Sequence, residues 1–119
     1  MTKMTLADAV AEFEIEATED YIGLWEVIGR AQELAKNDRS ADVRALTLDL
    51  VRRMLSRNFH AGDLADAGGF VDWPDQNPDS VIRRIETEWD HLERDPEYMA
   101  DAGPAYDPGI GLIVWFSRD

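Results

Sequence analysis

The apolar positions of the chain recur at helical spacing in several segments, and the first of these follows Thr5. This residue is placed to cap a helix, with Asp8 three positions later as in a capping box. The apolar face that follows is short, however, and the alternation FEIEA over residues 13–17 is equally typical of a brief strand. For this segment both a helix and a strand therefore remain open.

Three longer segments predict the main helices, because their apolar residues form one continuous stripe each. They cover residues 20–36, 41–57 and 80–93. Asp20 opens the first, Ser40 caps the second, and a Pro-Asp-Ser sequence starts the third. Asn58 is the residue type that takes up a left-handed conformation, so we expect it to end the second helix.

Between and after these helices the pattern changes to that of strands. FHAGDL (59–64) and FVDW (70–73) flank a glycine-containing turn and predict a β-hairpin. GLIVWFS (111–117) is apolar on both faces, which places it in the middle of a sheet. The sequence thus predicts an α+β fold of three main helices on a small antiparallel sheet, in a single domain over 1–119. The long loop 95–109 has no assigned role.

Composition agrees with a folded protein and narrows its chemistry. Apolar residues make up 45% of the chain and charged residues 31%, enough to form a packed core. The absence of cysteine excludes disulfides, thiolate metal sites and cysteine nucleophiles. The first residues lack the apolar stretch of a secretory signal, and no segment is apolar enough to enter a membrane. We therefore expect a cytoplasmic protein.

The net charge of −13 is distributed unevenly along the chain. Residues 1–29 carry −6, residues 30–57 carry +3, and residues 58–119 carry −10. A basic segment therefore lies between two acidic ones, and the surface is expected to be dipolar. Such a charge repels nucleic acid and anionic lipid as a whole and favours a partner with a basic surface.

No catalytic motif is present, and the two histidines, His60 and His91, have no motif around them. His60, Asp63 and Asp66 are spaced so that a strand and a turn would not place them on one side, where they could bind the same metal ion. We therefore predict no enzyme activity, no cofactor and no metal site.

One near match to a calcium loop exists, because four oxygen-bearing residues have the spacing of EF-hand ligands. They are Asp75, Asn77, Asp79 and Glu86. Ser80 stands where that loop needs glycine, and Pro78 lies inside it. An ordinary helix start is the favoured interpretation, with calcium binding as an alternative.

Two features suggest contact with a protein partner. The acidic stretch EFEIEATED includes Glu12, Glu14 and Glu16, which could dock a basic surface or form a hydrated face. Trp73 beside Pro74 at a strand end is a candidate exposed anchor, whereas Trp89 and Trp115 fall on core faces.

The order of a helix, a helix with a basic edge and the hairpin FHAGDLADAGGFVDW resembles the second half of a winged-helix domain, over residues 20–74. In that family the recognition helix contacts DNA. The resemblance implies contacts from the basic edge, namely Arg44, Arg52, Arg53 and Arg57. Acidic residues in the proposed wing oppose that role. A non-enzymatic protein-interaction module is therefore the leading hypothesis, DNA binding the second, and calcium binding or a small enzyme the third.

Overall fold

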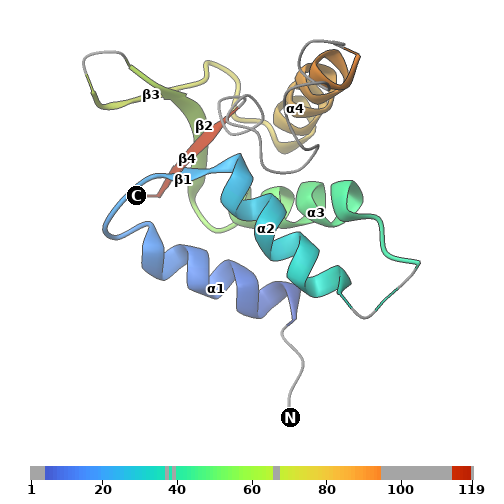
Figure 1. Ribbon diagram of the computed structural model, residues 1–119. Coiled ribbons are helices and arrows are strands. Elements are labelled where there is room, and N and C mark those ends of the chain that lie inside the picture. Colours follow the sequence, from blue (N-terminus) through green and yellow to red (C-terminus); the bar gives the residue numbers. More distant parts are fainter. Residues whose placement is uncertain (1–4, 37, 39, 66–67, 95–113, 119) are drawn as a thin grey trace.

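The computed structural model describes residues 5–36, 38, 40–65, 68–94 and 114–118. Within them the elements are α1 (Leu6–Glu16), β1 (Ile22–Gly23), α2 (Leu24–Ala35), α3 (Val43–Leu55), β2 (Phe59–Leu64), β3 (Phe70–Asp72), α4 (Pro78–Glu93) and β4 (Trp115–Arg118). The fold is α+β, as predicted, with four helices and one antiparallel sheet of four strands in the order β1-β4-β2-β3. Figure 1 shows α1, α2 and α3 gathered beside the sheet, and α4 above α3.

The N-terminal segment, for which the sequence allowed either a helix or a strand, is a helix. Thr5 and Asp8 form the predicted capping box, in which the Asp8 amide donates to Thr5 Oγ1 at 3.1 Å and the Thr5 amide donates to Asp8 Oδ2 at 2.9 Å. Phe13 is buried while Ile15, two positions later, is 70% exposed. One helical face therefore packs inward, and the FEIEA alternation carries no strand.

Two predicted helix starts are wrong, for different reasons. The helix expected from Asp20 begins at Leu24, because Ile22 and Gly23 pair with β4 instead. The helix expected after Ser40 begins at Val43, and its N-cap is Asp42, whose Oδ1 accepts from the Arg44 and Ala45 amides.

The end of the second predicted helix and the start of the third agree more closely with the sequence. Asn58 has φ of +70° and follows α3, as expected of a left-handed stop. In α4, Asn77 rather than the Pro-Asp-Ser sequence provides the cap, accepting from the Asp79 amide at 3.0 Å. Pro78 occupies the first helical turn, where no amide donor is needed.

The predicted hairpin and the central strand are confirmed. β2 pairs with β3, and β4 lies between β1 and β2. Ile22, Phe116 and Ala61 are cross-strand neighbours on three strands, and all are buried on the face that meets the helices. The first three residues of GLIVWFS, 111–113, lie outside the described residues, and so does the loop 95–109.

The core joins all four helices to the inner face of the sheet. Its largest fully buried side chains are Phe13, Ile22, Leu24, Ile28, Leu50, Met54, Ile85 and Phe116. Beyond Asp72 the carboxamide of Gln76 takes the place of a strand against β2. It accepts from the Ala61 amide at 2.9 Å and donates to the Ala61 carbonyl at 2.8 Å. This side chain therefore connects the start of α4 to the sheet.

Candidate partner-binding site

A groove lies between α1 and α2. Its volume is about 500 Å³. Phe13 and Glu16 line it from α1, and the α2 residues that line it are Trp25, Glu26, Gly29, Arg30, Gln32, Glu33 and Lys36. The walls therefore combine the aromatic side chains of Phe13 and Trp25 with charges of both signs.

At one level of the groove the charges of the two helices are matched. Arg30 of α2 reaches Glu12 of α1, with 2.6 Å between Nη2 and Oε2. The same guanidinium binds Glu33 on its own helix at 2.9 Å. This arrangement crosslinks α1 to α2, with the Arg30 guanidinium shared between Glu12 and Glu33.

One helical turn away the charges are not matched. Glu16 follows Glu12 by four residues and Glu26 precedes Arg30 by four, so these two acids face each other across the groove. Burial, the hydrogen bond that the protonated Glu26 carboxyl group donates to the Glu16 carboxylate, and the charges of Glu16 and Asp20 together raise the pKa of Glu26 to about 7. Neither Glu16 nor Glu26 makes an ion pair within the described part of the chain.

Beside this acidic pair lies Trp25, the most exposed of the described tryptophans. Its side chain is 46% exposed although it borders the core residue Leu24. A Cβ atom built on Gly23 would lie only 2.8 Å from Cδ1 and Nε1 of Trp25, so the indole rests directly on this glycine. The ring is thus held against the backbone and offers its remaining surface to solvent and to the groove.

The three predicted acidic residues are used differently. Glu16 lies in the groove, and Glu12 pairs with Arg30. Glu14 binds Arg57 at 3.0 Å and Arg118 at 3.4 Å, and so connects α1 to the end of α3 and to β4. Of the three, Glu16 alone combines a place in the groove with no ion pair among the described residues.

The prediction of an exposed Trp73 is wrong. Its side chain is only 3% exposed, and the Arg84 guanidinium lies 3.7 Å above the ring centre. Trp25 is the exposed tryptophan that sequence reasoning did not select. Its position beside the apolar stripe, rather than in it, was the available signal.

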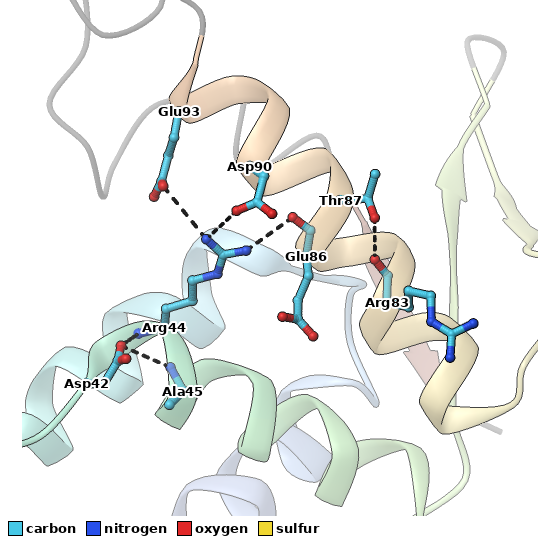
Figure 2. A network of polar contacts seen from close by, with 8 residues as sticks. All are labelled: Asp42, Arg44, Ala45, Arg83, Glu86, Thr87, Asp90 and Glu93. Atoms are coloured by element: carbon cyan, nitrogen blue, oxygen red, sulfur yellow. Dashed lines mark hydrogen bonds and ion pairs between the residues drawn. The ribbon is translucent and has the colours of Figure 1, made fainter.

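The arginines of the predicted basic edge are all engaged with acids. Figure 2 shows Arg44 reaching from α3 to α4, where it contacts Asp90 at 2.8 Å and Glu93 at 3.7 Å and donates to the Glu86 carbonyl at 3.1 Å. Its guanidinium also lies 5.1 Å from the ring centre of Trp89. Arg44 therefore fastens α3 to α4.

The other three arginines are more exposed but also paired. Arg52 binds Asp79 at 2.8 Å, Arg53 approaches Asp49 at 3.5 Å, and Arg57 binds Glu14. A nucleic acid would have to compete with these carboxylates for each guanidinium.

The four residues with calcium-loop spacing also have other uses. Asp79 is bound to Arg52, Asn77 caps α4, and Asp75 accepts from the Asn77 amide at 2.9 Å. That hydrogen bond, with a further one from Ser80, holds the pKa of Asp75 below its ordinary value. No group of three or more His, Asp or Glu residues suited to a metal ion occurs in the described ranges.

His60, which the sequence analysis considered together with Asp63 and Asp66, contacts a different acid. Its Nδ1 lies 3.3 Å from Oδ2 of Asp72, the residue that faces Gly62 across the hairpin. Asp66 lies outside the described residues.

Comparison with protein-family models, with curated proteins and with solved structures finds no match to this chain. Of the helices that the structure describes, none has the length and apolar character required to cross a membrane. The fold and the groove thus define an α+β protein with a candidate acidic and aromatic binding site.

Proposed function

We propose that the chain is a protein-interaction module that binds a lysine or arginine side chain of a basic partner in the groove between α1 and α2. One observation carries this proposal: Glu16 and Glu26 face each other, neither of them in an ion pair among the described residues, one helical turn from the pair Glu12–Arg30. Two carboxyl groups kept close together favour any ligand that brings a positive charge between them.

Trp25 supplies the second part of the recognition. A cation over an indole face gains about 0.5–1 kcal/mol at an exposed site and more where water is displaced. The aliphatic part of a lysine or arginine would pack on the same ring, and its charged end would reach the two acids. The negative field of a chain with a net charge of −13 would also speed the encounter with a basic partner.

A pair of blocked peptides, acetyl-GARAG-amide and acetyl-GAQAG-amide, tests this function by calorimetric titration. Only the arginine peptide should bind. The double variant Glu16→Gln, Glu26→Gln should weaken its binding by about tenfold or more, because charge-assisted hydrogen bonds contribute about 1.5–3 kcal/mol. Trp25→Leu should weaken it by roughly two- to fivefold.

Glu19→Gln is the matched control. Glu19 is exposed and lies in the same acidic segment, but it is not part of the groove. If Glu19→Gln reduces binding as much as Glu26→Gln does, the peptide responds only to overall charge, and the proposed site is wrong.

A further inference from the structure

The groove does not end at Trp25 but meets a second set of aromatic side chains on the sheet. Trp115 of the central strand β4, predicted on a core face, lies instead on the face of the sheet that points away from the helices and is only partly buried. Its cross-strand neighbours are Gly23 on one side and Gly62 on the other. With no side chain on either neighbour, Trp115 has room for its indole to lie flat over the adjacent strand.

Gly23 is the point where the groove and this face join. A Cβ atom there would lie 2.8 Å from the Trp25 indole and 3.1 Å from Cζ3 of Trp115. Both rings therefore cover the same glycine, one from α2 and the other from β4. Trp25 is 46% exposed and Trp115 is partly exposed, so the two indoles form adjoining parts of one surface.

On the other side of Trp115 the aromatic surface continues. A Cβ atom on Gly62 would lie 2.6 Å from Cζ of Phe70, so the Phe70 ring covers the second glycine. Tyr21 stacks on Phe70 with 5.3 Å between ring centres and an interplanar angle of 27°. Leu64, the cross-strand partner of Phe70, is 40% exposed. A partly exposed apolar surface that borders a charged groove is typical of a protein-binding site.

We infer that the partner segment carries an aromatic or large apolar residue next to its basic residue. The aromatic or apolar side chain packs on Trp115 and Phe70, on the other side of Gly23 from the groove. This inference rests on the proposed function, since the basic residue in the groove determines where its neighbour lies. The occupant is a basic segment of another protein because the surface adjoins Glu16, Glu26 and Asp20. Two copies of this chain would bring these acids against each other.

The experiment compares acetyl-GFRFG-amide with acetyl-GARAG-amide on the intact chain. The phenylalanines stand on both sides of the arginine because either chain direction is allowed. Burial of one such ring should tighten binding by about tenfold, which corresponds to about 1.4 kcal/mol. Gly23→Ala should remove most of this advantage, because the new methyl group displaces Trp25 and Trp115. Phe70→Ala, which adds no atoms, should reduce the advantage as well.

The outcomes separate the two proposals. Equal binding of both peptides, with binding of acetyl-GARAG-amide still dependent on Glu26, would overturn the inference and leave the proposed function intact. Tighter binding of acetyl-GFRFG-amide that is unaffected by Glu26→Gln would remove the proposed function instead. A dimer in sedimentation experiments that dissociates in the Trp25→Ala variant would show that a second copy is the occupant, and the inference would be wrong.

Discussion

Replacing Glu26 by glutamine tests the electrostatics of the groove without a ligand. The pKa of Glu26 is raised from 4.5 to about 7 by burial first and then by the Glu16 carboxyl group and Asp20. Between these two pH values the folded protein keeps a proton that the unfolded chain has lost. The free energy of unfolding therefore falls as the pH rises through this window, and the full penalty is present above pH 7.

The size of the penalty follows from the two pKa values. A change from 4.5 to about 7 corresponds to about 3 kcal/mol, at roughly 1.4 kcal/mol for each tenfold change in proton affinity. Glu26 is only partly buried, so solvent screening reduces the penalty to about 1–2 kcal/mol. Glutamine keeps the shape and loses the charge. Above pH 7 the Glu26→Gln variant should therefore be more stable by about 1–2 kcal/mol, or roughly 4–8 °C in Tm.

Urea unfolding followed by far-ultraviolet circular dichroism, at a series of pH values from about 4 to 8, measures this difference directly. The wild-type and Glu26→Gln curves should coincide near pH 4.5 and separate progressively up to pH 7. Glu19→Gln removes the same charge from an exposed position and should follow the wild type. Parallel curves for the wild type and Glu26→Gln, or an equal gain from Glu19→Gln, would refute the reasoning.

Three further predictions concern charged side chains of the groove and of α3 and α4. Glu26→Lys should stabilise the fold, because a lysine there can form with Glu16 the kind of ion pair that Arg30 forms with Glu12. The same variant should no longer bind acetyl-GARAG-amide. A less stable variant, or one that still binds the peptide, would contradict the proposed binding site. Calcium at millimolar concentration should leave Tm unchanged, because Asp79 is already bound to Arg52; a Tm increase that disappears in Glu86→Gln would revive the calcium alternative. Duplex DNA should show no retardation at low salt, and retardation that weakens in the double variant Arg52→Ala, Arg53→Ala would restore the DNA-binding hypothesis.

The parts of the fold that were predictable depend on neighbours in sequence. The capping box of Thr5 and Asp8 and the left-handed stop at Asn58 are local features, and both were recognisable in the residues themselves. β1 was missed because its two residues form a strand only through pairing with Trp115 and Phe116, more than ninety positions later. That distant pairing also moved the start of α2 from Asp20 to Leu24.

The candidate site was only partly predictable for a related reason. The acidic segment was visible, and Glu16 was among the residues selected, but its opposing partner Glu26 depends on how α1 packs against α2. Trp73 was chosen as the exposed anchor and Trp25 was not considered, because exposure depends on tertiary contacts. Trp73 is covered by Arg84 of α4, whereas the Trp25 indole lies against Gly23 and stays 46% exposed.

The Gln76 carboxamide has a consequence for how the protein avoids self-assembly. β3 ends at Asp72, and beyond it the Trp73 amide still donates to the Ala61 carbonyl of β2, which leaves the Ala61 amide without a backbone acceptor from β3. An unpaired strand backbone is a template onto which a strand of another molecule can add. The Ala61 carbonyl accepts from the Trp73 amide as well as from Gln76, but among the described residues the Ala61 amide donates to the Gln76 carboxamide. Loss of the Gln76 side chain would therefore free this amide for a strand of another molecule.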